Sequence, residues 1–131
     1  MLYRIEPSNG LAIYDQIARQ IKFAVAHGAL RAGDLIPSVR ELAQTLAVNP
    51  NTVARAYRDL QVDGIVEPLR GEGLRIARLA AERCRKERQK LLKDRLKSAI
   101  LECRHGGLEL AEIRSLISEV LQETSSAGVN S

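Results

Sequence analysis

Two helix starts and one helix stop lie within the segment PSVRELAQTLAVNPNTVARAYRDLQVDG, residues 37–64. Ser38 and the glutamate three residues later have the spacing of a capping box, which begins a helix. Asn49 followed by Pro50 is a second start, because proline at the first helical position needs no amide donor. Gly64 offers a left-handed stop. Two short helices joined by a tight turn predict a helix-turn-helix, so DNA is the first partner to consider.

The flanks of this segment complete a winged fold. Apolar residues recur at helical spacing over residues 12–27, which predicts a preceding helix. Two β-prone segments, 65–69 and 74–77, flank a glycine-bearing loop and predict a hairpin with Pro68 at an edge position. Residues 2–5 are expected to form a short strand that ends at a turn. The expected fold is mainly α with a small β wing, a winged helix-turn-helix.

The composition changes after Ala77. A long amphipathic helix is expected over residues 79–103, a break at Gly106-Gly107, and a second helix over 110–122. The predicted organisation is a winged helix-turn-helix DNA-binding domain at residues 1–77, a two-helix dimerisation segment at 78–123 and a disordered tail at 124–131.

Bulk composition excludes several classes of protein. No apolar run approaches the ~20 residues of a membrane span, and the N-terminus does not open a signal peptide, so we expect a cytoplasmic protein without a membrane partner. Cys84 and Cys103 are nineteen positions apart on one expected helix, about 28 Å, and cannot pair within the chain. They are interpreted as small apolar residues, with a redox sensor as the alternative. No metal-ligand spacing is present, and no cofactor is expected.

One face of the helix expected at residues 50–63 has the chemistry that reads DNA bases. Its apolar residues gather on one side, and Asn51, Arg55 and Arg58 lie opposite, with Thr52 at the flank. Arginine contacts guanine, asparagine contacts adenine, and threonine contacts either base or the thymine methyl group. The alternative interpretation is an ordinary solvated face, which the helix-turn-helix context disfavours.

Further residues are expected to position the protein on the phosphate backbone. Arg40 lies in the first turn of its helix, where a phosphate would offset its unfavourable interaction with the helix dipole. Backbone amides at the two helix starts can bind phosphate, and an arginine at the wing tip can enter the minor groove. The candidate DNA-binding residues are Ser38, Arg40, Asn49, Asn51, Thr52, Arg55, Arg58, Arg70 and Gly71.

The C-terminal helices carry apolar stripes that require burial. Two helices cannot enclose a ligand pocket alone, and the simplest burial is against the same stripes of a second copy of the chain. The candidate dimer-interface residues are Leu91, Leu92, Leu96, Ile100, Ile113, Leu116, Ile117 and Val120. The net charge is +4, and residues 78–97 hold nine basic and three acidic side chains. That stretch is either a solvated face or an added attraction for DNA.

The segment IPSVRELAQTLAVNPNTVARAYRDL, followed by DGIV and RGEG, resembles the N-terminal domain of GntR-type bacterial transcription regulators. The NPNTVxRAY variant and the short C-terminal part resemble the YtrA subfamily. This resemblance implies that Arg40, Thr52 and the wing around Gly71 touch DNA, and that a dimer binds a palindromic operator. Many members have arginine where Pro50 and Ala54 stand here, so those two contacts do not transfer. Arg55 is therefore our main candidate for base readout.

The expected function is a sequence-specific transcription regulator, most simply a repressor, acting on a double-stranded DNA operator. Two alternatives remain at this stage: a winged-helix protein-interaction module, and a regulator that senses a small molecule in a pocket between subunits. An enzyme is not expected. RGEG lacks the lysine and the strand-loop-helix context of a phosphate-binding loop, and no catalytic arrangement of side chains has suitable spacing.

Overall fold

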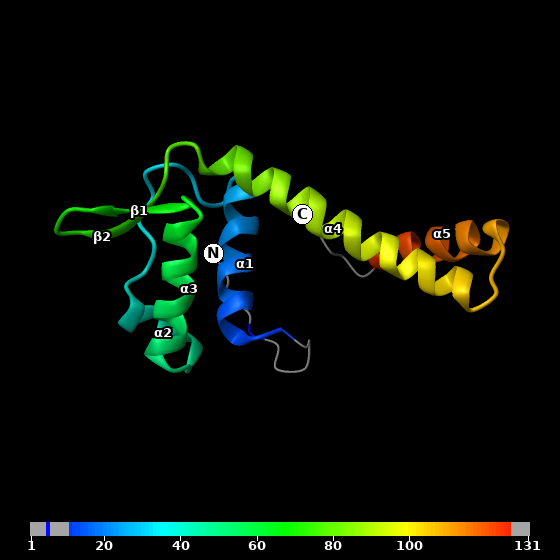
Figure 1. The fold of residues 1–131 in the computed structure, drawn as a ribbon, viewed down its shortest axis with the longest axis horizontal. Coiled ribbons are helices and arrows are strands. Elements are labelled where there is room, and N and C mark those ends of the chain that lie inside the picture. Colours follow the sequence, from blue (N-terminus) through cyan, green and yellow to red (C-terminus); the bar gives the residue numbers. More distant parts are fainter. Residues whose placement is uncertain (1–4, 6–10, 127–131) are drawn as a thin grey trace. The chain divides into compact units, whose positions relative to one another are not determined.

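The computed structural model describes residues 5 and 11–126, which form five helices and one hairpin (Figure 1). The elements are α1 (Ile13–Ala26), α2 (Val39–Leu46), α3 (Pro50–Val62), β1 (Val66–Leu69), β2 (Gly73–Ile76), α4 (Ala80–His105) and α5 (Leu110–Ser126). The chain divides into two compact units, Met1–Gln89 and Lys90–Ser131. The prediction of a mainly α, winged helix-turn-helix fold followed by two helices is confirmed. Apart from Ile5, the strand expected at residues 2–5 lies outside the described residues.

The helix starts form as the sequence predicted. At α2, Ser38 Oγ accepts the Glu41 amide at 3.1 Å and the Ser38 amide donates to Glu41 Oε1 at 3.1 Å. Hydrogen bonds from the Ser38 backbone and side chain lower the pKa of the Glu41 carboxyl. At α3, Asn49 Oδ1 accepts the Asn51 amide at 2.8 Å, and proline follows the cap. Gly64, with a φ of 75°, follows the α3 cap as a left-handed stop.

The turn between α2 and α3 has a feature that the sequence did not indicate. Ala47 ends α2 in the left-handed conformation, with φ 56° and ψ 46°. It is the only residue other than glycine with a positive φ in the part of the chain that the structure describes. The left-handed region is unfavourable for a side chain by about 1–2 kcal/mol. The tight turn is therefore made at a cost in stability.

The first unit has an aliphatic core, in a chain of which only 3% of the residues are aromatic. α3 packs against α1 and α2 (Figure 1). The largest side chains with under 2% exposure are Ile17, Ile21, Val25, Leu42, Val53, Leu60, Ile65, Ile76 and Cys84. Tyr57 is also buried, and its hydroxyl donates to the Pro37 carbonyl at 2.7 Å. This core fixes α2 and α3 relative to each other.

The wing is a two-stranded antiparallel hairpin. Val66 pairs with Ile76, and Leu69 pairs with Gly73. The loop before α2 lies along the other side of β2, since the Ile36 amide donates to the Leu74 carbonyl at 3.0 Å. Among the described residues β1 is therefore the outer strand, and Pro68 lies at the edge position that the sequence predicted.

The first turns of α4 belong to the winged-helix unit. Ala80 and Cys84 are 1% and 0% exposed within its core. The compact unit therefore ends at Gln89, whereas the sequence placed the boundary after Ala77. The helix continues the core because two small side chains face it. Burial, followed by the nearby Glu87 charge, raises the pKa of the Cys84 thiol to about 11, so this cysteine lacks the thiolate that a redox sensor needs.

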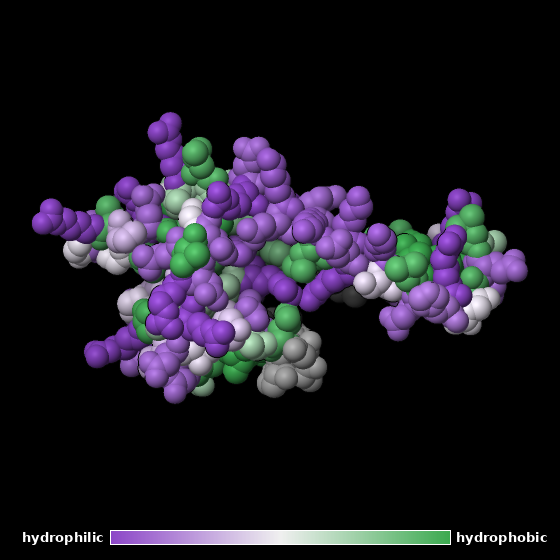
Figure 2. All heavy atoms as spheres, viewed as in Figure 1, coloured by the Kyte–Doolittle hydropathy of each residue, from purple (hydrophilic) through white to green (hydrophobic). Residues whose placement is uncertain are grey.

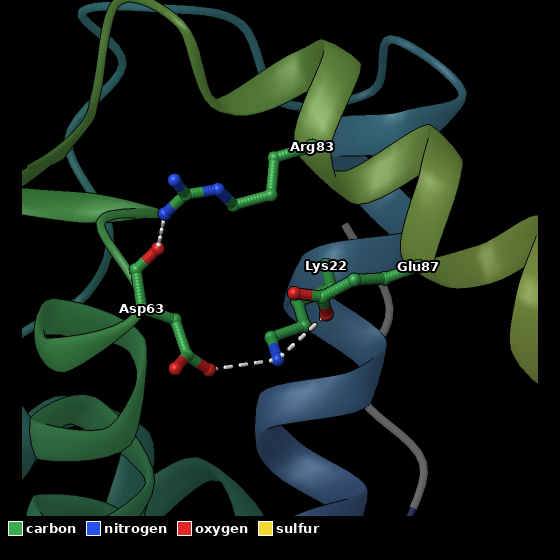
Figure 3. A network of polar contacts seen from close by, with 4 residues as sticks. All are labelled: Lys22, Asp63, Arg83 and Glu87. Carbon is green, nitrogen blue, oxygen red and sulfur yellow. Dashed lines mark hydrogen bonds and ion pairs between the residues drawn. The ribbon is translucent and has the colours of Figure 1, made fainter.

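A polar network fastens α4 to α1 and α3 (Figure 3). Lys22 Nζ lies 3.0 Å from Asp63 Oδ2 and 2.9 Å from Glu87 Oε2. Arg83 donates to the Asp63 carbonyl at the end of α3. Burial lowers the pKa of Lys22, but hydrogen bonds to Glu87 and Asp63 outweigh this effect and raise the pKa overall. The start of α4 is therefore held to the end of α3 by two cations.

The second unit consists of the remainder of α4 and α5, joined at Gly106-Gly107 as predicted. α5 continues to Ser126, so the first three residues of the predicted disordered tail are helical; residues 127–131 lie outside the described range. Figure 2 shows hydrophobic surface on this helix pair, and large exposed side chains include Leu92, Leu96, Leu116 and Val120. No helix within the described residues is long and apolar enough to cross a membrane.

Candidate nucleic-acid interface

The two faces of α3 separate as the helical pattern predicted. Val53, Ala56, Tyr57 and Leu60 are at most 4% exposed and pack in the core. On the other side, Asn51, Arg55 and Arg58 are exposed, and Thr52 is half-buried. The structure therefore presents three residue types that hydrogen-bond base edges, on the second helix of a helix-turn-helix.

Arg40 occupies the position expected of a phosphate anchor. It is exposed in the first turn of α2, where the positive end of the helix dipole disfavours a cation. It makes no hydrogen bond, ion pair or ring contact with any residue that the structure describes. A backbone phosphate would satisfy this side chain and offset the interaction with the dipole.

The two cap residues differ from the expectation. Ser38 uses both its amide and its hydroxyl in the capping box, and the Asn49 side chain accepts the Asn51 amide. The Ser38 and Asn51 amides, which lie at the two helix starts where we expected phosphate to bind, are therefore already donating. The reason is physical: the hydrogen bonds that start each helix use the same donors that an anion would need. Ser38 and Asn49 shape the surface by starting the helices.

The wing tip presents one arginine on a tight turn. The Glu72 amide donates to the Leu69 carbonyl at 2.8 Å, which closes a turn around Arg70 and Gly71. Gly71 has a φ of 78° and would have nothing within 4 Å of an added Cβ. The glycine is therefore required by the turn conformation rather than by crowding. Its contribution to the surface is to present the exposed Arg70.

Arg55 has an intramolecular partner that the sequence did not reveal. Its Nη2 atom donates to the Tyr14 hydroxyl at 2.9 Å, and its Cζ atom lies 3.7 Å from the centroid of the Tyr14 ring. Tyr14 comes from α1, outside the helix-turn-helix, 41 positions earlier in the chain. Nothing in the helical spacing of α1 or α3 pairs these two residues, because the contact depends on how the helices cross.

The predicted dimer-interface residues fall into three groups by exposure. Leu92, Leu96, Leu116 and Val120 are exposed; Leu91, Ile100 and Ile117 are half-buried. Ile113, also predicted to lie in the interface, is only 3% exposed in the single chain. It is buried within the chain and cannot meet a second copy without rearrangement. Leu101, Leu110 and Leu121, which were not among the candidates, are also exposed.

Comparison with known proteins also indicates a DNA-binding regulator. The model of the family described as bacterial regulatory proteins, gntR family, matches residues 13–76. The HTH-type transcriptional repressor YtrA of Bacillus subtilis is 37% identical over 119 residues, covering 91% of this chain and 92% of that protein. The Bacillus subtilis regulator YhcF, described as an uncharacterized HTH-type transcriptional regulator, is 44% identical over 90 residues, covering 69% of each chain.

Solved structures extend the similarity to both units. A transcriptional regulator from Oenococcus oeni has a TM-score of 0.71 and 30% identity, and the match covers 92% of this chain and 99% of that one. These comparisons confirm the resemblance and identify a transcription regulator with a GntR-type DNA-binding domain, not an enzyme. The chain belongs to the gntR family of bacterial regulatory proteins, and its similarity to YtrA spans nearly its whole length.

Proposed function

We propose that this protein is a repressor that binds a palindromic operator as a homodimer. The observation that carries the proposal is the exposed Asn51, Arg55 and Arg58 face of α3, displayed by a capped helix-turn-helix beside a wing. The similarity to a transcriptional repressor over 92% of that repressor's length supports the direction of regulation. In a bacterial cell, the setting that the family description names, an operator lies in the cytoplasm, so we place the protein there.

In this proposal the DNA contacts divide between two roles. Asn51, Thr52, Arg55 and Arg58 reach base edges in the major groove and supply specificity. Arg40 contacts the phosphate backbone, and Arg70 reaches the minor groove from the wing tip. Ser38, Asn49 and Gly71 act by fixing the helix starts and the wing turn.

The proposed dimer forms through the second unit. Exposed leucine and valine side chains on α4 and α5 remain in contact with water in a single chain. Pairing with the same surface of a second copy would bury them in an isologous interface. Two winged-helix units would then contact half-sites about 34 Å apart, or a multiple of that distance.

Two substitutions test the assignment of roles, once a cognate operator has been selected from genomic fragments. Arg55→Ala is expected to weaken operator binding by roughly 1–3 kcal/mol and to relax base preference, because a base contact is lost. Arg40→Ala is expected to weaken operator and random DNA alike and to reduce the slope of affinity against salt concentration. Titrations of both duplexes at several salt concentrations measure these effects.

The same titrations separate the proposal from other functions. If Arg55→Ala lowers the affinity for the operator and for random DNA by the same factor, Arg55 does not read a base. A wild-type protein with no competitor-resistant complex on any genomic fragment would favour a protein-interaction module. A metabolite that changes operator affinity would add a ligand-sensing role.

A further inference from the structure

One exposed arginine of the candidate DNA surface is held by a tyrosine from outside the helix-turn-helix. Tyr14, the second residue of α1, contacts Arg55 in two ways. The Arg55 guanidinium lies over its ring, with 3.7 Å from Cζ to the centroid, and Nη2 donates to its hydroxyl at 2.9 Å. A cation–π contact and a hydrogen bond therefore act on one guanidinium together.

This support is specific to Arg55. The other exposed arginines of the surface, Arg40, Arg58 and Arg70, have no hydrogen bond, ion pair or ring contact with any described residue. Tyr14 is itself half-buried and packs against the core of the first unit. Its ring is thus anchored to the folded domain, and the guanidinium that rests on it shares that anchor.

The contact leaves Arg55 able to read a base. A guanidinium has five N–H donors, and one donated to Tyr14 leaves four. A bidentate contact with guanine requires two. An arginine side chain without a partner on the protein surface loses much conformational freedom when it contacts a base. A side chain that is already held in place loses less. Contact with the Tyr14 ring would therefore lower the entropic cost of a base contact by Arg55, and it leaves enough N–H donors for that contact.

We propose that Tyr14 is a positioning residue for base readout: its ring and hydroxyl hold the Arg55 guanidinium in place before DNA is bound. The inference rests on the proposed role of Arg55 in reading the operator. It makes α1 part of the specificity of the protein, although no residue of α1 needs to touch a base. The alternative is a brace between α1 and α3 that contributes only to folding.

The test uses the full-length protein and four variants: Tyr14→Leu, Tyr14→Phe, Arg55→Ala and the combination Tyr14→Leu/Arg55→Ala. Phe23→Leu is the matched control, since Phe23 is the other aromatic residue of α1 and makes no contact with Arg55. Affinity is measured at fixed salt for the selected operator, for random DNA and for operators with single base-pair changes. Thermal unfolding of each variant accompanies the binding data.

Tyr14→Leu is expected to lower the ratio of operator to random affinity by about three- to tenfold, at the same base pairs that Arg55→Ala affects. Tyr14→Phe keeps the ring and is expected to retain most of the ratio, while Phe23→Leu leaves it unchanged. The combined variant should be no less specific than Arg55→Ala alone, because both changes remove one function. If Tyr14→Leu unfolds the protein, Tyr14→Phe still tests the hydroxyl through a smaller shift at the same base pairs.

Four results would overturn the inference. Tyr14→Leu that lowers the unfolding midpoint but keeps the affinity ratio would make the contact a folding brace. Full additivity in the combined variant would separate Tyr14 from Arg55. If Arg55→Ala leaves base preference intact, the proposed readout role of Arg55 fails, and the inference fails with it. Arg55→Ala could change the affinities for the single-base-pair operators while neither Tyr14 variant changes them. That result would overturn the role of Tyr14 but keep the proposed role of Arg55.

Discussion

The two units of this chain differ in how much of their apolar side chains they bury. The first unit, Met1–Gln89, buries a contiguous aliphatic core shared by three helices, the wing and the start of α4. In the second unit, Lys90–Ser131, Ile113 alone is fully buried among the hydrophobic residues that the structure describes. That unit carries seven of the eleven large exposed hydrophobic side chains in the described ranges. The first unit therefore buries its apolar side chains within the chain, whereas the second leaves most of its large ones exposed, as the proposed dimer requires.

A matched pair of leucine substitutions tests this comparison with the largest expected effect. Leu60→Ala removes a fully buried side chain of the first unit and is expected to lower the free energy of unfolding by about 2–5 kcal/mol at any protein concentration. Leu96→Ala changes a side chain that is 57% exposed, so its effect is expected to shrink as the protein is diluted and the proposed dimer dissociates. Urea unfolding at several protein concentrations measures both. Equal, concentration-independent effects would contradict the comparison.

The polar network around Lys22 tests how firmly α4 is joined to the first unit. Lys22→Met is expected to lower the free energy of unfolding by about 1 kcal/mol, because the lysine, 21% exposed, pairs with two carboxylates. The raised pKa of Lys22 means that this contribution is fully present below its ordinary pKa of 10.5 and is lost as pH rises through the folded value. Urea unfolding from pH 7 to 11 measures it.

Lys86→Met is the control for Lys22→Met. Lys86 pairs with Glu82 at 3.6 Å on the surface of the same helix, and both side chains are more than 70% exposed. Its removal is expected to change stability by less than about 0.5 kcal/mol. Two lysine variants with the same small effect would show that the network does not hold α4.

A further small effect is expected at the turn between α2 and α3. Ala47→Gly relieves the left-handed conformation of Ala47 but adds freedom to the unfolded chain, so a net gain of about 0.5–1 kcal/mol in stability is expected. Thermal unfolding measures the gain. A loss of stability would mean that the turn is not strained by its side chain.

Local signals in the sequence were sufficient to predict the helix starts, the wing and the separation of the α3 faces. The capping box at Ser38 and the Asn49-Pro50 start each depend on neighbouring residues, so single-sequence reasoning finds them. The candidate DNA surface follows from the same local pattern, because side-chain direction on a helix repeats with its geometry.

Contacts between segments that are distant in the sequence could not be predicted from the sequence. The pairing of Tyr14 with Arg55 and the burial of Cys84 and Ile113 depend on how helices pack, which spacing along one helix does not specify. For the same reason the first compact unit extends to Gln89, past the domain boundary predicted after Ala77: Cys84 faces the first core from a helix whose pattern is continuous through Gln89. The left-handed Ala47 was missed because alanine gives no turn signal.

In the proposed function, the first unit recognises half an operator and the second unit joins two such halves. The most direct test compares the affinity of the wild type and of a Leu92→Ala/Leu96→Ala variant for a full palindrome and for a single half-site. We predict that the wild type prefers the palindrome by about 100-fold or more, and that the variant keeps its half-site affinity but loses most of that preference. A variant that retains the full wild-type preference for the palindrome would contradict this division of roles between the two units.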